Sequence, residues 1–99
     1  MTDVVYHADA FEEYQHAAIH YTNISQSLGK QFFERIEAAV TLISGQPSSW
    51  TRVSKNVRRM PVKQFPYSIF FSEYNGAVII LAIAHQKRKP NFWKQRTIK

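Results

Sequence analysis

The dipeptide Asn75-Gly76 constrains the fold more than any other feature of this sequence. It separates residues 68–74 from residues 77–85, two segments that are rich in β-branched and aromatic side chains. A two-residue type I′ turn needs a positive φ at both central positions, and Asn-Gly is a pair that adopts this conformation readily. The sequence therefore predicts an antiparallel β-hairpin centred on this turn.

The turn also fixes which residues of the hairpin face each other. The pairs expected on one face are Glu73 with Val78, Phe71 with Ile80, and Ile69 with Ala82. The pairs expected on the other face are Ser72 with Ile79, and Phe70 with Leu81. The second strand is apolar at every position from 78 to 84, which is typical of a strand buried on both faces. We expect helices to cover one of these faces, and the C-terminal segment or a partner chain to cover the other.

Two amphipathic helices precede the hairpin in the sequence. Apolar residues recur at helical spacing over residues 10–28 and again over residues 32–43. Gly29 is expected to separate the two helices, and Gly45 with Pro47 to end the second one. The result is a helical hairpin whose apolar side needs a sheet to cover it.

The order of the elements predicts an α+β fold in one domain that spans residues 1–99. Residues 4–6 are an expected N-terminal strand. Residues 57–63 are a third strand of the meander, in which Pro61 favours an edge or a bulge. The N-terminal strand, the two-helix hairpin and the three-stranded antiparallel meander together give a four-stranded, mainly antiparallel sheet. A short helical or irregular segment follows at the C-terminus.

Composition argues against several chemical classes. The chain has no cysteine and three glycines, so disulfides, thiolate metal sites and glycine-rich phosphate loops are not expected. His16 and His20 are four residues apart, but no carboxylate lies between them, and we interpret them as exposed surface residues rather than metal ligands. No cofactor is expected. The sequence shows no signal peptide and no run long enough to span a membrane, so we expect a soluble cytoplasmic protein.

Charge is distributed unevenly along the chain. Residues 1–50 carry two basic and six acidic residues, a net charge of −4, whereas residues 51–99 carry eleven basic residues and one acidic residue, a net charge of +10. This asymmetry indicates a basic surface that meets nucleic acid or an acidic protein segment. The residues expected on this surface are Arg58, Arg59, Lys63, His85, Lys87, Arg88, Lys89, Trp93 and Arg96.

Several of these residues admit two interpretations. Arg58 and Arg59 alternate along one strand and point to opposite faces, so only one of them is expected to lie beside His85. His85 ends the central strand, where it would either transfer a proton or hydrogen-bond to the backbone and fix the turn. Trp93 would either stack on a base or seal the sheet, as large aromatic residues in small domains usually do.

Several segments carry a resemblance to a known family. They are Ala10-Phe11-Glu12-Glu13, Leu28-Gly29-Lys30-Gln31-Phe32-Phe33, residues 43–47, Val57-Arg58-Arg59, Phe65-Pro66-Tyr67-Ser68-Ile69-Phe70-Phe71, and the pattern His-x-x-Arg-x-Pro-x-x-Trp at residues 85–93. In this combination the chain resembles, over nearly its whole length, the ParE/RelE superfamily of toxins from bacterial type II toxin–antitoxin systems.

The resemblance implies a toxin that is neutralised by a cognate antitoxin, a protein partner. In this family a segment of the antitoxin folds on binding and wraps the helices and the sheet of the toxin. The apolar face of the hairpin is then the expected antitoxin-binding surface, formed by Phe70, Ile79, Leu81 and Ile83. Neither a small-molecule substrate nor a membrane is implied.

The two branches of the superfamily differ in their target. The ParE branch is associated with poisoning of DNA gyrase, whereas the RelE branch cleaves messenger RNA on the ribosome. A RelE-like nuclease would use His85 as the acid, with Tyr67 as a weak candidate for the base. The residues that would hold phosphate are Arg58, Arg59, Lys63 and Arg88. The C-terminal Tyr or His cluster that is typical of RNA-cleaving members is missing. The sequence therefore favours a ParE-like toxin that acts by binding, over an endoribonuclease and over a basic nucleic-acid-binding module.

Overall fold

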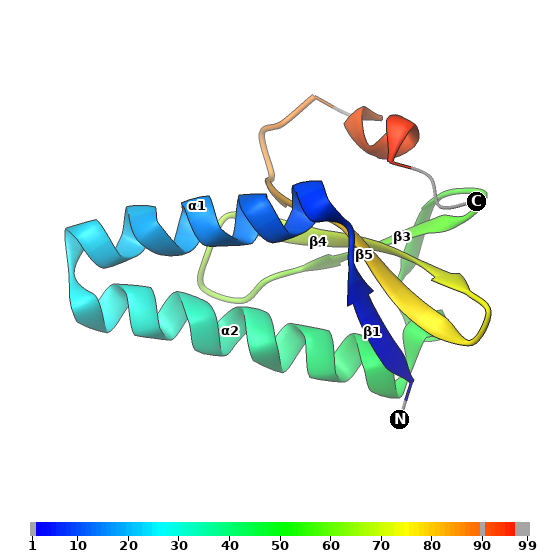
Figure 1. The fold of residues 1–99 in the computed structure, drawn as a ribbon, viewed down its shortest axis with the longest axis horizontal. Helices are drawn as coiled ribbons and strands as arrows, with labels where there is room; N and C mark the ends of the chain where they lie inside the picture. Colours follow the sequence, from blue (N-terminus) through cyan, green and yellow to red (C-terminus); the bar gives the residue numbers. More distant parts are fainter. Residues whose placement is uncertain (1, 90, 97–99) are drawn as a thin grey trace.

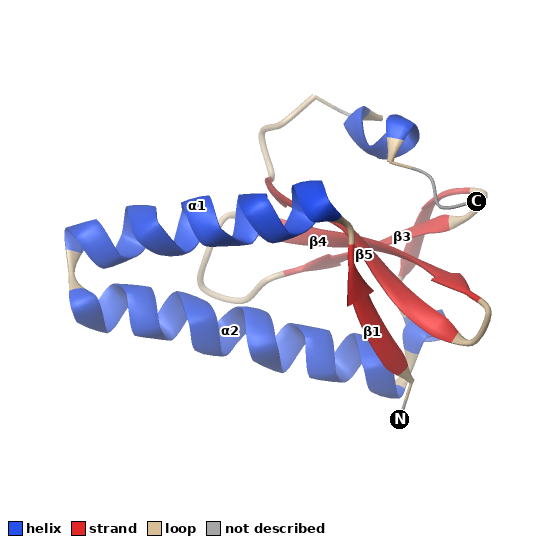
Figure 2. Ribbon diagram, in the orientation of Figure 1, coloured by secondary structure: helices blue, strands red, loops and turns tan. Residues whose placement is uncertain are grey.

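The computed structural model describes residues 2–89 and 91–96, which form two long helices and one sheet (Figure 1). In chain order the elements are β1 (Asp3–Tyr6), α1 (Ala8–Ile24), α2 (Gln26–Gly45), the 3-10 turn η1 (Pro47–Ser49), β2 (Thr51–Ser54), β3 (Val57–Pro61), β4 (Tyr67–Tyr74), β5 (Ala77–His85) and the 3-10 turn η2 (Phe92–Gln95). The two helices lie side by side as an antiparallel hairpin, and the strands gather beside it (Figure 2). None of the helices described is both long and apolar enough to cross a membrane.

The sheet has five strands in the order β1-β5-β4-β3-β2. β1 runs parallel to β5 at one edge, and the other neighbouring strands are antiparallel. The prediction of four strands is therefore wrong by one, because β2 also joins the sheet through β3. The sequence of β2, Thr51-Arg52-Val53-Ser54, contains a single apolar residue and lacks the hydrophobic alternation that marks a strand. Pro61 is the last residue of β3 and lies beyond the part of β3 that pairs with β2.

The predicted hairpin is confirmed. Asn75 has a φ of 50° and Gly76 a φ of 76°, so both central residues of the turn are in the left-handed region. Three of the predicted pairs agree with the observed register, namely Glu73 with Val78, Ser72 with Ile79, and Phe71 with Ile80.

Farther from the turn, a β-bulge between Phe70 and Phe71 shifts the register. Phe70 pairs with Ala82 instead of Leu81, and Ile69 pairs with Ile83 instead of Ala82, so these two predicted pairs are wrong. The extra residue is Leu81 on β5, which lies between the partners of Phe71 and Phe70. Every later residue of β5 then faces the opposite side of the sheet from the one that simple alternation predicts, whereas β4 keeps its alternation. Ile83 consequently faces the helices.

A hydrophobic core lies on each face of the sheet. On the helix side, Phe32, Ile36 and Ile43 of α2 are fully buried. They belong to one cluster with the strand residues Ile69, Phe71, Val78, Ile80 and Ile83. On the other side, Trp93 of η2 belongs to a second cluster with Val57, Phe70, Ile79, Leu81, Ala82 and Ala84. The sequence predicted that either the C-terminal segment or a partner chain covers this face of β5, and the structure shows the C-terminal segment there.

The break between the helices falls at Ser25, so the prediction that Gly29 separates them is wrong. The backbone N–H of Ser25 donates to the Tyr21 carbonyl and closes α1, while its hydroxyl accepts from the backbone N–H of Leu28 at 3.0 Å and caps α2. Ser is a favoured N-cap residue because its oxygen satisfies a free N–H of the first turn. Gly29 lies inside α2, where it allows a close approach to Thr22 of α1.

Replacement of Gly29 by alanine is expected to lower the free energy of unfolding by about 1–3 kcal/mol. A Cβ at this position would lie 2.9 Å from the Cα of Thr22 and would also clash with the Thr22 side chain. At a helix position with free space around it, replacing glycine by alanine normally raises the free energy of unfolding by up to about 1 kcal/mol. Urea unfolding measures the difference. The matched control is Gly45→Ala, since a Cβ on Gly45 meets no atom within 4 Å. Equal effects at the two positions would argue against close helix packing at Gly29.

Candidate functional site

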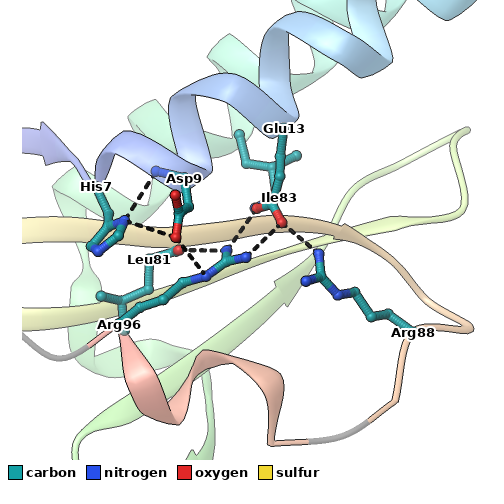
Figure 3. A network of polar contacts seen from close by, with 7 residues as sticks. All are labelled: His7, Asp9, Glu13, Leu81, Ile83, Arg88 and Arg96. Atoms are coloured by element: carbon teal, nitrogen blue, oxygen red, sulfur yellow. Dashed lines mark hydrogen bonds and ion pairs between the residues drawn. The ribbon is translucent and has the colours of Figure 1, made fainter.

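Glu13 of α1 holds the C-terminal segment, by which we mean residues 86–89 and 91–96, against β5 (Figure 3). Its carboxylate accepts hydrogen bonds from Arg88 Nη1 at 2.5 Å and from Arg96 Nη1 and Nη2 at 2.9 Å each. It also accepts from the backbone N–H of Ile83 at 3.1 Å. Arg96 in turn donates to the Leu81 carbonyl at 3.1 Å. We call Glu13, Arg88 and Arg96 the carboxylate clamp.

Glu13 and Arg96 are mostly buried, which makes their hydrogen bonds stronger than those of an exposed ion pair, whereas the side chain of Arg88 is 41% exposed. The side chain of Glu13 is 18% exposed and that of Arg96 is 11% exposed. Arg96 binds the carboxylate through both terminal nitrogens, and its Nε lies 3.6 Å from a carboxylate oxygen of Asp9. Bidentate arginine–carboxylate pairs combine charge with fixed geometry. The clamp therefore positions the C-terminal segment on the sheet.

A cavity of 320 Å³ lies between the sheet and the C-terminal segment. Arg59 of β3 with Ser68 and Phe70 of β4 form part of its sheet wall, and Phe92 and Trp93 form part of the opposite wall. Its other lining residues are Val53, His85, Gln86, Arg88, Lys89 and Asn91. No carboxylate is among the described residues that line it, so the cavity favours an anionic group. We call it the basic cavity.

A second cavity, of 290 Å³, lies between α1 and the end of β5. Its lining includes Glu13, His16, His20 and Tyr67, and it shares His85 and Arg88 with the basic cavity. His16 and His20 are exposed, in agreement with their prediction as surface residues. His85 thus lies where the two cavities meet.

Arg58 and Arg59 point to opposite faces of the sheet, as their alternation predicts. Arg59 pairs with Phe70 and lines the basic cavity near His85. Arg58 pairs with Phe71 on the helix side, and its guanidinium donates to the Trp50 carbonyl at 2.8 Å. The structure therefore places Arg59, and not Arg58, in the same cavity as His85.

The lysines of the expected basic surface are all exposed. Lys89 lines the basic cavity, and Lys87 lies in the turn after β5. Lys63 lies in the loop between β3 and β4 and is not among the residues that line the basic cavity. Arg88 and Arg96, which the sequence placed on the same surface, point toward Glu13, so part of their charge is compensated within the chain.

Of the two interpretations of His85, the structure shows the one in which its ring hydrogen-bonds to the backbone and fixes the turn after β5. Its Nδ1 accepts a hydrogen bond from the backbone N–H of Lys87 at 3.1 Å. Its ring lies edge-on to Tyr67, with 5.5 Å between the ring centroids. Burial, with a smaller contribution from Tyr21, raises the pKa of Tyr67 above its ordinary value of 10.0. Tyr67 is therefore protonated at neutral pH and is poorly suited to act as a general base.

The apolar face that was expected to bind the antitoxin is already covered. Trp93 is 6% exposed and stacks on Phe70, with 4.7 Å between the ring centroids and an interplanar angle of 20°. Phe70, Ile79 and Leu81 lie beneath the C-terminal segment as buried members of the same cluster. The prediction that Ile83 shares their face is wrong, because the bulge at Phe70 turns Ile83 into the helix-side core.

Sequence reasoning missed the role of Glu13. Its carboxylate bonds to Arg88 and Arg96, which lie 75 and 83 residues farther along the chain. The one available signal was charge, since the clamp joins the acidic half of the sequence to the basic half.

Comparison with known proteins agrees with this architecture. Residues 4–90 match the family model described as the ParE toxin of the type II toxin–antitoxin system parDE. No curated protein sequence matches the chain. The fold is similar to that of a chain in the chromosomal ParDE TA system from P. aeruginosa, with a TM-score of 0.73 and 17% sequence identity, over 86% of this chain and 96% of that one. Because the family model spans most of the sequence, the chain belongs to the ParE toxin family of type II toxin–antitoxin systems.

Proposed function

We propose that this ParE toxin inhibits DNA gyrase through protein contacts, and that a cognate antitoxin neutralises it. The observation that favours binding over RNA cleavage is the separation of the candidate catalytic groups. Arg58 lies on the opposite face of the sheet from Arg59, and Arg88 is bound to Glu13. A nuclease requires its acid, its base and its phosphate-binding cations to converge on one phosphate. Among the described residues, His85, Arg59 and Arg88 line the basic cavity, but Arg58 and the candidate base Tyr67 do not.

The basic surface that remains available to a target is smaller than the sequence suggests. Lys87 and Lys89 are exposed beside His85, and Arg59 lies in the adjoining cavity. Such a surface accelerates encounter with an acidic surface of a protein target and favours its correct orientation. Lys87 and Lys89 are accordingly the residues that we assign to target contact.

Exposed aromatic residues on the helical hairpin support binding of an antitoxin there. Phe11 of α1 is 51% exposed and Phe33 of α2 is 53% exposed. They are linked through Tyr6 and Tyr14, since each successive pair of rings in the series Phe11, Tyr6, Tyr14, Phe33 has its centroids 6.3 Å apart. Contiguous exposed apolar patches commonly mark protein–protein contacts. The antitoxin is thus expected on the helices rather than on the sheet face that η2 covers.

Expression of the chain alone in bacteria is expected to arrest growth, with gyrase-linked DNA breaks and intact messenger RNA in the first minutes. Co-expression of the cognate antitoxin should restore growth. Rapid cleavage of messages at ribosome-occupied codons would instead support the endoribonuclease, and unimpaired growth at good expression would contradict toxicity through either target.

The double substitution Lys87→Glu, Lys89→Glu is expected to reduce gyrase inhibition at least about tenfold, because it reverses the charge at the expected contact surface. Both side chains are exposed, so the free energy of unfolding should change by less than about 0.5 kcal/mol per site. Growth assays and supercoiling by purified gyrase give the two readouts. The double substitution Lys30→Glu, Lys55→Glu, at two other exposed lysines, makes the same change of charge and is the control. An equal loss of inhibition in the control would refute a specific contact at Lys87 and Lys89.

A further inference from the structure

Three polar side-chain atoms around the basic cavity have no hydrogen-bond partner among the described residues. They are Arg59 Nε, Ser68 Oγ and Trp93 Nε1. Ser68 is only 1% exposed and Trp93 only 6% exposed. Buried polar groups without a partner are few in native proteins, since leaving one unsatisfied destabilises the fold. Three of them around one cavity indicate that water or a ligand supplies their hydrogen bonds.

The chemistry of the three groups specifies what that partner is. The Nε of arginine and the indole Nε1 of tryptophan can only donate a hydrogen bond, while the serine hydroxyl can donate or accept. The missing partner is therefore an acceptor. Arg59, Arg88 and Lys89 add positive charge to the lining, and none of the described lining residues is acidic. A phosphate group, with several charged oxygens, satisfies more of these donors than a neutral carbonyl does.

The remaining wall contains the aromatic ring of Phe92, over which the guanidinium of Arg88 lies 4.1 Å from the ring centroid. Phe92 stands edge-on to both Phe70 and Trp93, with its ring centroid 5.4 Å from each. The cavity of 320 Å³ lies near the lower end of the range of about 300–1,000 Å³ that small-molecule sites occupy. This volume is of the size of a single nucleotide, with its base, ribose and phosphate, rather than of a longer chain.

We propose that the basic cavity binds a single nucleotide, with its phosphate at Arg59, Ser68 and Trp93 Nε1 and its base beside Phe92. This goes beyond gyrase inhibition, and no bond is made or broken in the step. The three groups are buried in the walls, so the ligand reaches them through a small outward shift of η2. The clamp, through Arg96, and the stacking of Trp93 on Phe70 hold η2 in place and limit that shift.

The proposal is tested by calorimetric titration of the purified chain with each of the four ribonucleoside 5′-monophosphates. At least one is expected to bind with a Kd below about 1 mM, and more tightly than adenosine or inorganic phosphate alone. Arg59→Gln should weaken binding at least about tenfold, because it removes a charged donor. Arg52→Gln should leave binding unchanged, since Arg52 is exposed and pairs with Arg58 on the opposite face of the sheet.

Additional probes distinguish the source of the nucleotide and the alternatives. A 5′-phosphorylated single-stranded tetranucleotide that binds more tightly than the monophosphates would identify a strand end as the source and would also support the proposal. Lys89→Gln, a change at an exposed residue, should weaken binding severalfold even if Arg59→Gln impairs folding. Failure of every nucleotide to bind, equal binding by Arg59→Gln with an intact fold, or preferential binding of an acidic peptide would overturn the proposal. The titration involves neither gyrase nor growth, so its outcome is independent of whether the chain inhibits gyrase.

Discussion

Replacing Glu13 by alanine is expected to lower the free energy of unfolding by about 3 kcal/mol. The change leaves the guanidinium of Arg96, which is 11% exposed, without its main partner. It also removes the acceptor of the Ile83 backbone N–H and the partner of Arg88. Removing one member of a largely buried ion pair costs more than the pair contributes, because a charge remains buried without compensation. Urea unfolding of the purified chain measures the loss.

Two further variants make this prediction specific. Glu12→Ala removes an exposed carboxylate one position away and should change stability by less than about 0.5 kcal/mol. Glu13→Gln retains one acceptor oxygen and should give an intermediate loss. In Glu13→Ala, the tryptophan emission of the chain should also shift toward that of an exposed indole, since η2, which contains Trp93, loses its anchor. If the free energy of unfolding of Glu13→Ala lies within about 1 kcal/mol of that of Glu12→Ala, the clamp contributes no more to stability than a surface ion pair does.

Local sequence chemistry was sufficient to predict the hairpin and the separation of the two arginines. The φ values at Asn75 and Gly76 are set by those two residues, and the turn fixes the pairs next to it. Alternation along one strand is likewise local, which is why Arg58 and Arg59 were expected on opposite faces. Both features depend on residues that are close in the chain.

Register beyond the bulge could not be predicted, because a bulge depends on packing across the whole sheet. The segment from 78 to 84 is apolar at every position, so no polar residue marks Leu81 as the extra residue of the bulge. Ile83 is as hydrophobic as Leu81 and fits either face. A strand with an apolar and a polar side would have revealed the shift through its pattern.

The candidate site was predicted in composition but not in geometry. The basic residues after β5 were identified from charge, yet the structure divides them between the clamp and the basic cavity. This division depends on Glu13, whose partners are remote in sequence, and spacing along the chain contains no information about such contacts. The sequence also does not identify Ser68 as a residue of the site, because serine is common in strands and turns alike.

Replacing Phe32 by alanine is expected to lower the free energy of unfolding by about 3–5 kcal/mol, the other large effect that the structure predicts. Phe32 is 0% exposed at the centre of an aromatic cluster. Its ring centroid lies 5.1 Å from that of Tyr21, 5.1 Å from that of Phe65 and 5.4 Å from that of Tyr67. The cost combines lost burial with the cavity left in a tightly packed interior, and urea unfolding measures it.

The next residue in the chain supplies the matched control, since Phe33 is 53% exposed and its replacement by alanine should cost less than about 1 kcal/mol. The comparison also tests how the core supports the site. Phe32 contacts Tyr67, whose ring lies against His85 at the meeting point of the two cavities. Loss of Phe32 should therefore loosen the end of β5 and increase amide exchange there, whereas loss of Phe33 should not. If Phe32→Ala destabilises the chain while exchange near His85 stays unchanged, the helix-side core stabilises the fold without positioning the site.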